Sequence, residues 1–452
     1  MDEAKKKLAE FGIKIPEILL PKEMNLKQWA VVACDQFTQD KNYWTKVKET
    51  AAGAPSTLEM ILPEAFLEDG NLNEKIDGIN RNMSAYLDNG IFAEPHLGFM
   101  YIERDTPFNS GRKGLVAAVD LEKYDWSPAS RPMIRSTEGT VADRLPPRMD
   151  IRRNAPIETP HILLLIDDET NTLLPALGKR AKKNNPAYQG ELMLNSGSIS
   201  GWYLDAEDDM AFFANELKKL ASRTLTRYGV CKRDRGDEPF LFAVGDGNHS
   251  LASAKGIWEE VKAKNNEQRT ENKDFCRYAL VEIENIYDPA IKFEPIHRVM
   301  FGLSFDKTLD LLSVLPDFEF NKYNSFEELV RWTSMPVLGN CFGIFSCGNG
   351  SEVSYAVIKT SATGISTACL QPLLDSVVYG DVTIDYIHGE DELFRIVNFA
   401  AGKNTTGILL PPVQKAGFFE TIARSGPLPR KSFSMGEASE KRFYVECRKL
   451  SG

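Results

Sequence analysis

The sequence predicts an α/β fold, with α+β as the alternative, in which helices flank a mixed sheet. Short apolar runs typical of strands alternate along the chain with segments whose apolar residues recur at helical spacing. A length of 452 residues, with 42% hydrophobic and 26% charged residues, is that of a globular protein large enough for more than one core. After Gly302 the pattern restarts in a more compact form. We therefore expect an N-terminal domain over residues 1–302 and a smaller C-terminal α/β domain over residues 303–452.

The N-terminal domain is expected to contain at least five strands. Several of the apolar runs are apolar at consecutive positions, which is typical of strands buried on both faces. The expected strands cover residues 29–33, 114–119, 161–166, 240–244 and 279–283. A helix is expected directly after the fourth strand, because Leu251, Ala254, Trp258 and Val261 would share one face.

The C-terminal domain shows the same alternation at shorter spacing. Helices are expected over residues 307–315, 325–332, 371–378, 391–399 and 413–423. Strands are expected over residues 341–345, 353–358, 382–387 and 407–410.

Charge, cysteine usage and missing motifs exclude several classes of protein. The formal net charge of −10 argues against binding to nucleic acid, which depends on a basic surface. Seven scattered cysteines without a C-x-x-C pair indicate neither a disulfide framework nor a zinc site. No apolar run is long enough for a signal peptide core or a membrane span. We expect a cytoplasmic protein whose partners are small molecules, and the sequence does not indicate its oligomeric state.

Four well-known catalytic motifs are also absent from the sequence. It contains no G-x-x-x-x-G-K-[ST], no G-x-G-x-x-G, no H-E-x-x-H and no G-x-S-x-G. P-loop, Rossmann, zincin and α/β-hydrolase sites are therefore disfavoured.

The first candidate site lies where the fourth strand meets its helix, in Val-Gly-Asp-Gly-Asn-His-Ser at residues 244–250. A helix N-terminus presents unpaired N–H groups and the positive end of the helix dipole, so such a junction suits a phosphate group. Glycine allows close backbone approach, amide and imidazole side chains add donors, and an aspartate can hold Mg²⁺ or accept a proton. The alternative is a tight Asp-Gly turn with a helix cap and a packed histidine. The candidate roles are phosphate or cofactor binding for Gly245, Gly247, Asn248 and Ser250, phosphate binding or catalysis for His249, and catalysis or metal binding for Asp246.

The second candidate site is an arginine-rich stretch over residues 131–153. It holds six arginines, three acidic residues and no lysine. The planar guanidinium group suits bidentate contact with phosphate or carboxylate. Arg135 and Arg148 are therefore candidates for contacts to a transferring phosphate group. The alternative for each arginine is a structural ion pair with a neighbouring acid.

Two further stretches supply single candidates. Asp35 follows the first expected strand, and strand ends line ligand sites in α/β folds, so Asp35 is a candidate second catalytic acid. Its neighbour Cys34 is expected to be a buried apolar residue rather than a nucleophile. Arg298, in Glu-Pro-Ile-His-Arg at residues 294–298, is a candidate phosphate contact. A structural role is favoured for His96, His161 and His388. The basic stretch over residues 426–444, which includes Lys441, could bind a phosphate, but such a stretch is more often a solvated face.

Four separate stretches carry a resemblance to a known family. They are WAVVACDQFTQDKNYW at residues 29–44, IRSTEGTVADRLPPRMDIRRNAPIETPHILLLIDD at 134–168, GDGNHSLASAK at 245–255 and EPIHRVM at 294–300. In these stretches the chain resembles the domain-of-unknown-function 1015 family. The better-known branch of that family has Asp-Gly-His-His-Arg where this chain has residues 246–250. The resemblance implies no particular reaction.

More distantly, the Asp-Gly-Asn-His junction resembles the phosphate-binding strand–turn–helix of the ParB and sulfiredoxin superfamily, which includes nucleotide-dependent partitioning proteins and free-serine kinases. This resemblance implies a ParB/sulfiredoxin-like element that binds a nucleotide, ATP, ADP or CTP, at residues 245–250. Ser250 replaces the usual phosphate-contacting arginine, so Arg135 or Arg298 would have to substitute for it. Asn248 stands where sulfiredoxins have their catalytic cysteine, which excludes sulfiredoxin chemistry.

The leading hypothesis for function is a nucleotide-dependent phosphotransferase that acts on a small molecule with Mg²⁺. In it, Asp246 is the Mg²⁺ ligand or base, and Arg135 and Arg148 stabilise the transferring group. A nucleotide or metabolite sensor without turnover is the second hypothesis. An enzyme that acts on a carboxylated or phosphorylated metabolite without a nucleotide is the third. The predicted site requires the four family-like stretches to meet in space.

Overall fold

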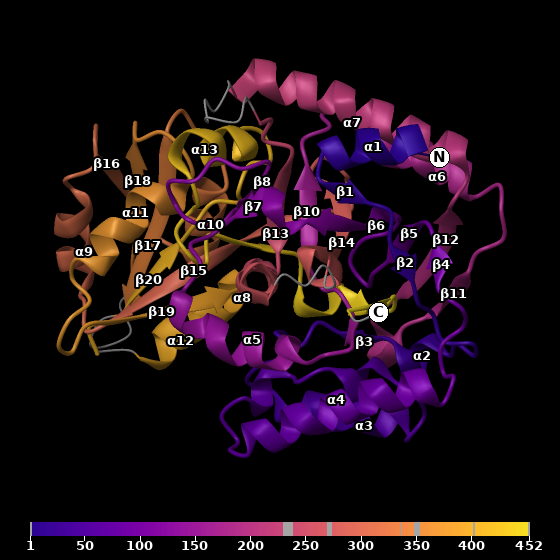
Figure 1. Cartoon of the computed structure of the whole chain (residues 1–452). Coiled ribbons are helices and arrows are strands. Elements are labelled where there is room, and N and C mark those ends of the chain that lie inside the picture. Colours follow the sequence, from indigo (N-terminus) through magenta and orange to yellow (C-terminus); the bar gives the residue numbers. More distant parts are fainter. Residues whose placement is uncertain are drawn as a thin grey trace. The chain divides into compact units, whose positions relative to one another are not determined.

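The computed structural model describes residues 2–228, 238–268, 274–335, 337–347, 353–400 and 403–450. The chain divides into two compact units (Figure 1). The first unit comprises Met1–Ile291 and Gly436–Gly452, and the second comprises Lys292–Met435. Each unit contains both helices and strands, which confirms the predicted α/β class.

The first unit is built on a ten-stranded mixed sheet. Its order is β11-β12-β5-β6-β14-β10-β13-β8-β7, with β1 paired to β6. Pairing is parallel between β14 and β10, between β13 and β8 and between β8 and β7, and antiparallel elsewhere. The strands are β1 (Ile13–Lys14), β5 (Phe99–Asp105), β6 (Arg112–Asp120), β7 (Tyr124–Asp125), β8 (Ile134–Ser136), β10 (Leu163–Ile166), β11 (Tyr188–Glu191), β12 (Ser198–Leu204), β13 (Phe242–Asp246) and β14 (Tyr278–Asn285).

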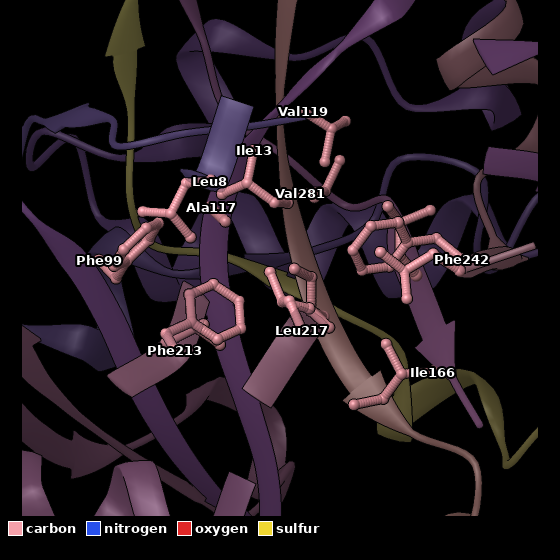
Figure 2. Close-up of a cluster of buried hydrophobic side chains, with 14 of the residues drawn as sticks. Leu8, Ile13, Phe99, Ala117, Val119, Ile166, Phe213, Leu217, Phe242 and Val281 are labelled. Carbon is pink, nitrogen blue, oxygen red and sulfur yellow. The ribbon is translucent and has the colours of Figure 1, made fainter. Parts of the chain in front are cut away.

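One face of this sheet carries an apolar core. Side chains that alternate along the strands, among them Ala117 and Val119 of β6 and Val281 of β14, pack against helix residues such as Phe213 and Leu217 (Figure 2). Figure 1 places α1, α6 and α7 on one side of the sheet and α3 and α4 on the other. The helices of the first unit are α1 (Asp2–Glu10), α2 (Leu26–Trp29), α3 (Lys41–Ala51), α4 (Leu72–Asp88), α5 (Leu145–Arg153), α6 (Leu173–Ala181), α7 (Glu207–Tyr228) and α8 (Asn248–Gln268).

The opposite face of the sheet carries charged side chains as well as apolar ones. Glu282 and Glu284 alternate along β14 with the apolar residues Val281 and Ile283, and both are buried. Arginines from β6 and from the end of the chain neutralise them. We call this set the buried network, and it comprises Arg112, Glu282, Glu284, Arg442 and Glu446.

The last described residues of the chain pair with segments of the first unit. Three short antiparallel ribbons tie distant segments together, and two of them use this C-terminal segment. In addition, Trp29 Nε1 donates to the Val445 carbonyl over 2.9 Å. The ribbons pair β2 (Glu17–Ile18) with β4 (His96–Leu97), β3 (Val31–Val32) with β22 (Phe443–Tyr444), and β9 (Ile157–Glu158) with β23 (Arg448–Lys449).

The second unit is a seven-stranded antiparallel sheet with helices on both faces. Its order is β16-β18-β17-β20-β15-β19, with β21 paired to β15. Apolar residues of α9 and α11 cover one face, and those of α10 and α12 cover the other. The strands are β15 (Phe293–Phe301), β16 (Glu319–Tyr323), β17 (Asn340–Cys347), β18 (Val353–Thr360), β19 (Thr383–His388), β20 (Thr406–Leu409) and β21 (Phe433–Met435), and the helices are α9 (Phe305–Leu312), α10 (Phe326–Thr333), α11 (Ser366–Asp375), α12 (Glu390–Phe399) and α13 (Phe418–Ser425).

The division between units differs from the expected boundary at residue 302. Strand β15 lies before that boundary, but it pairs with β19, β20 and β21 and so belongs to the second unit. The segment from Gly436 onward returns to the first unit instead of completing a C-terminal domain. Both differences arise from pairing between segments far apart in the sequence, which a local pattern does not reveal.

The expected strand over residues 29–33 is shorter in the structure. Trp29 ends helix α2, whose first turn is capped by the Asn25 side chain accepting from Lys27 N over 3.2 Å. Only Val31 and Val32 form a strand. The four other strands expected in this unit correspond to β6, β10, β13 and β14, and the helix expected after residue 248 is α8.

Candidate active site

The junction between β13 and α8 adopts the strand–turn–helix form that the sequence predicts. Strand β13 includes Gly245 and ends at Asp246, and Asn248 to Ser250 form the first turn of α8. Gly247 connects them with a φ of +81°, and a Cβ atom there would lie 3.1 Å from the Ile162 Cα atom. A left-handed backbone and this close approach both favour glycine at position 247.

Asn248 and His249 bind the loop that precedes α5. The Asn248 side chain accepts from Thr137 N over 3.2 Å and donates to Thr137 Oγ1 over 3.3 Å. His249 Nε2 lies 3.4 Å from Val141 N, a long contact for a hydrogen bond. The arginine-rich stretch and the junction are thus held together, with the two polar side chains of α8 at their contact.

Asp246 pairs with a lysine from the C-terminal segment. Its Oδ1 atom accepts from Gly247 N over 2.9 Å, and its Oδ2 atom lies 3.3 Å from Lys441 Nζ. The Lys441 side chain is only 8% exposed, whereas the Asp246 side chain is 19% exposed. A buried cation therefore stands beside the N-terminus of α8.

Asp35 lies close to the same lysine and to His161. Asp35 Oδ2 is 3.9 Å from His161 Nε2, and Asp35 Oδ1 accepts from Gln36 Nε2 over 2.9 Å. Burial alone would raise the pKa of Asp35, but the charge that His161 carries when it is protonated in acid, the hydrogen bond from Gln36 and the charge of Lys441 together hold it below the usual value. The carboxylate is therefore ionised at neutral pH and able to accept a proton.

We call Asp35, His161, Asp246 and Lys441 the site cluster. All four belong to the first unit, although they come from widely separated parts of the chain. The expectation that Asp35 would lie near Asp246 is consistent with their shared neighbour Lys441. His161 and Lys441 were not among the candidates. The basic C-terminal stretch was the sequence feature that could have indicated Lys441. For His161 the sequence offered only its position at the start of an apolar run.

Cys34 and Glu64 lie beside the site cluster. Burial, with the charges of Asp35 and Glu64, raises the pKa of the Cys34 thiol to about 12, so the thiol is neutral and a poor nucleophile. Burial also raises the pKa of Glu64, although Arg148 opposes the change. Arg148 forms an ion pair with Glu64 and donates to the Arg144 carbonyl over 2.7 Å.

The other two candidate arginines are buried among structural partners. Arg135 is 8% exposed, donates through Nε to the Pro132 carbonyl over 3.0 Å and stacks 4.3 Å from the centre of the Phe240 ring. Arg298 is fully buried in the second unit, where its Nε atom donates to Gln371 Oε1 over 3.1 Å. Their role in phosphate binding remains a prediction, and the site cluster of the first unit does not include them.

Within the described part of the chain, no group of three or more histidine, cysteine, aspartate or glutamate side chains is arranged to hold a metal ion. Asp246, the candidate Mg²⁺ ligand, instead directs its Oδ2 atom toward the Lys441 ammonium group. The residues present therefore do not fit a metal site centred on Asp246. None of the helices in the described residues combines the length and the apolar character that a membrane span requires.

Comparison with known families identifies the chain's relatives. The sequence pattern of one family matches residues 17–354. The chain belongs to the family described as protein of unknown function DUF1015. The match to DUF1015 includes Asp35, His161 and Asp246 of the site cluster, whereas Lys441 lies beyond it. No curated protein sequence matches the chain significantly.

Several solved structures share a distant similarity with this DUF1015 member. A conserved hypothetical protein from Pyrococcus furiosus is 11% identical with a TM-score of 0.34, covering 74% of this chain and 95% of its own. A free serine kinase in complex with AMP is 11% identical with a TM-score of 0.37, at 74% and 92% coverage. SbnI with a C-terminal truncation, from Staphylococcus aureus, is 10% identical with a TM-score of 0.36, at 73% and 86% coverage. Similarity at this level does not indicate which ligand this chain binds.

Proposed function

We propose that this chain is a nucleotide-dependent phosphotransferase for a small molecule, with its active site at the start of α8. The observation that carries the proposal is the position of Lys441. Its ammonium group lies 3.3 Å from Asp246 and close enough to Asp35 to lower the pKa of that carboxyl group. A buried cation, an ionised carboxylate and a helix N-terminus within one cluster are the parts that phosphoryl transfer needs.

Each part has a distinct role in the proposal. The N-terminal amides of α8, together with Asn248 and His249, bind the phosphate chain of the nucleotide. Lys441 balances the negative charge that the phosphate brings, as a point charge with three donors. The left-handed Gly247 lets the turn pack closely against Ile162, and this turn leads directly into the N-terminus of α8.

Asp35 acts as the general base in this proposal. It accepts the proton of the acceptor's hydroxyl group while the hydroxyl oxygen forms a bond to the terminal phosphorus. The bond between that phosphorus and the bridging oxygen breaks, and the nucleoside diphosphate leaves with the electron pair. Asp35 is ionised at neutral pH, as a base must be before it accepts a proton.

A Mg²⁺ ion is not needed to hold any of these residues in place. Where magnesium accompanies a nucleotide, most of its ligands are phosphate oxygens and water. Asp246 is engaged by Lys441, so the proposal assigns Asp246 to positioning the lysine.

A thermal-shift titration tests the proposal. The purified chain is titrated with ATP, ADP, CTP and GTP, with and without Mg²⁺, because a ligand that binds the native state raises the melting temperature. The same titration is made with Asp246→Ala/His249→Ala. The matched control is Asp205→Ala/His96→Ala, which removes an aspartate–histidine pair of 2.8 Å elsewhere in the first unit.

We expect a nucleotide to raise the melting temperature of the wild type and of the control, but not of the site variant. Product analysis under saturating nucleotide then distinguishes an enzyme from a sensor, because a sensor binds without conversion. Asp35→Asn should reduce turnover by about 10²–10⁴-fold while the nucleotide still binds. If no nucleotide stabilises the wild type, the proposal fails and an enzyme acting on a phosphorylated or carboxylated metabolite becomes the leading hypothesis.

A further inference from the structure

His161 directs its two ring nitrogens toward two different partners. Nδ1 lies 2.6 Å from the Tyr444 hydroxyl oxygen, and Nε2 lies 3.9 Å from Asp35 Oδ2. The Tyr444 ring stands almost perpendicular to the imidazole ring, at an interplanar angle of 83°. Both residues are nearly inaccessible to solvent.

A backbone amide occupies one lone pair of the Tyr444 hydroxyl oxygen. The N–H group of Cys34 donates to Tyr444 Oη over 3.1 Å, and a backbone N–H can only donate. The hydroxyl keeps its own hydrogen for a second partner, and in one of two orientations it donates that hydrogen to His161 Nδ1. With Nδ1 as acceptor, a neutral imidazole carries its hydrogen on Nε2, which faces Asp35.

The alternative orientation uses the Cys34 thiol, which also interacts with the Tyr444 hydroxyl. In that orientation the hydroxyl donates to sulfur, and His161 donates from Nδ1 to the hydroxyl. Sulfur is a weak acceptor compared with an imidazole nitrogen. The orientation would also turn a bare Nε2 lone pair toward the ionised Asp35 carboxylate. Both considerations favour the hydrogen on Nε2.

We propose that Tyr444 fixes His161 in the neutral tautomer that presents Nε2–H to Asp35, and that these two positioning residues orient the Asp35 carboxylate as the base. The role of Asp35 rests on the proposed function, whereas the tautomer of His161 does not. A donor and an acceptor side by side match a hydroxyl group, which is itself both donor and acceptor. His161 gains and loses no proton in the transfer step, because the hydroxyl proton goes to Asp35.

Nitrogen NMR of the histidine side chains tests the tautomer directly. The chain has five histidines, so the full protein labelled with ¹⁵N-histidine gives a small set of signals, and His161→Gln identifies the one from His161. At about pH 8, where an ordinary histidine is neutral, we expect a protonated Nε2 and an unprotonated Nδ1. A protonated Nδ1 with an unprotonated Nε2, or a doubly protonated ring at that pH, would overturn the proposal.

Two variants separate the roles of the hydroxyl and the thiol. Tyr444→Phe removes only the hydroxyl group, and we expect the His161 signal to change to a mixture of tautomers. Cys34→Ala removes the sulfur but keeps the donating backbone N–H, and we expect the tautomer to stay as in the wild type. A changed tautomer in Cys34→Ala would identify sulfur as the acceptor and refute the proposal, even if Tyr444→Phe does not fold.

Kinetics test the consequence for Asp35. With ATP as phosphoryl donor and water as the hydroxyl acceptor, we expect Tyr444→Phe to lower kcat by about tenfold and leave KM for ATP unchanged, because the base rather than the nucleotide site is disturbed. An equal kcat in Tyr444→Phe would refute the positioning role. If no nucleotide binds to the wild type while the NMR signature is as expected, the proposed function fails and the tautomer assignment stands.

Discussion

Two groups of ionisable side chains in the first unit differ in burial and in the distances between their paired atoms. In the buried network, Arg442 Nη1 lies 2.6 Å from Glu282 Oε2 and Arg112 Nε lies 2.9 Å from Glu284 Oε1, and no side chain of these pairs is more than 6% exposed. In the site cluster, the corresponding distances are 3.3 Å and 3.9 Å, and the carboxylates are 19% and 26% exposed. Close pairs in a dry interior hold chain segments together, whereas looser and wetter pairs keep capacity to interact with a ligand.

Both groups depend on the same C-terminal segment. Lys441 contributes to the site cluster and the next residue, Arg442, contributes to the buried network. Tyr444 and Glu446 follow at alternate positions, the first toward His161 and the second toward Arg442. The adjacent residues Lys441 and Arg442 thus contribute to different groups, and a single segment serves both.

The largest expected effect is the loss of stability from Arg442→Met. The substitution leaves the carboxylates of Glu282 and Glu446 buried without their shared partner. Breaking a buried pair in this way costs about 3–5 kcal/mol. Urea denaturation followed by circular dichroism measures the change. Lys7→Met, which breaks an exposed pair with Glu3, is the control and should leave the midpoint unchanged. An Arg442→Met midpoint equal to that of the control would show that the network is not structural.

The second prediction concerns the pH dependence of stability. Burial, together with the carboxylates of Glu282 and Asp288, raises the pKa of Glu284 to about 8 against the opposing charges of Arg112 and Arg442. An unfolded glutamate has a pKa of about 4.3, so between about pH 4 and pH 8 the native state binds more protons than the unfolded state. The contribution of Glu284 to stability is therefore complete below this window, is lost as the pH rises through it and is constant above it.

Glu284→Gln tests this sign, because glutamine resembles the protonated side chain and does not titrate. We expect the variant to show a smaller decline in the free energy of unfolding between about pH 5 and pH 8 than the wild type. Denaturant titrations at several pH values measure both slopes. Equal slopes would mean that Glu284 is ionised in the native network at neutral pH.

The third prediction concerns the turn that precedes α8. Gly247→Ala places a Cβ atom on a left-handed backbone, at a cost of about 1–2 kcal/mol, and brings it 3.1 Å from the Ile162 Cα atom. We expect a lower denaturation midpoint and a loss of nucleotide-induced stabilisation. Gly139→Ala in the arginine-rich stretch is the control, because a Cβ atom there meets nothing within 4 Å. Unchanged nucleotide binding by Gly247→Ala would separate the turn from the phosphate site.

Local sequence patterns were sufficient for the central elements of the first unit. The apolar runs that become β6, β10, β13 and β14 are buried on both faces. Gly247, before α8, marks a turn because its backbone is left-handed, a conformation that favours glycine. The strand expected over residues 29–33 is shorter in the structure, because Asn25 caps the start of a helix that continues through Trp29. Local sequence patterns thus predict a helix or strand well when the residues inside it determine where it begins and ends.

The candidate site could be predicted only in part, because half of it depends on long-range pairing. Asp246 was identified from its own turn, and Asp35 from its place after an expected strand. Lys441 and Tyr444 reach the site because β22 pairs with β3, more than four hundred residues away in the sequence. From Arg442 to Arg448 polar and apolar residues alternate, which was the available sign of a strand with buried charges. That pattern does not indicate that β22 pairs with β3.

Lys441→Met is expected to have the smallest effect on stability. It is also the most direct test of the difference between the site cluster and the buried network. It makes the same type of substitution as Arg442→Met at the adjacent position of the same segment. Because Asp246 is 19% exposed and 3.3 Å from the lysine, water can solvate the carboxylate, and we expect a loss of about 1 kcal/mol or less. Denaturation and thermal-shift titration are measured on both variants. Lys441→Met should abolish nucleotide-induced stabilisation at little cost in stability. Equal destabilisation by the two substitutions would mean that the site cluster, like the buried network, serves the fold rather than a ligand.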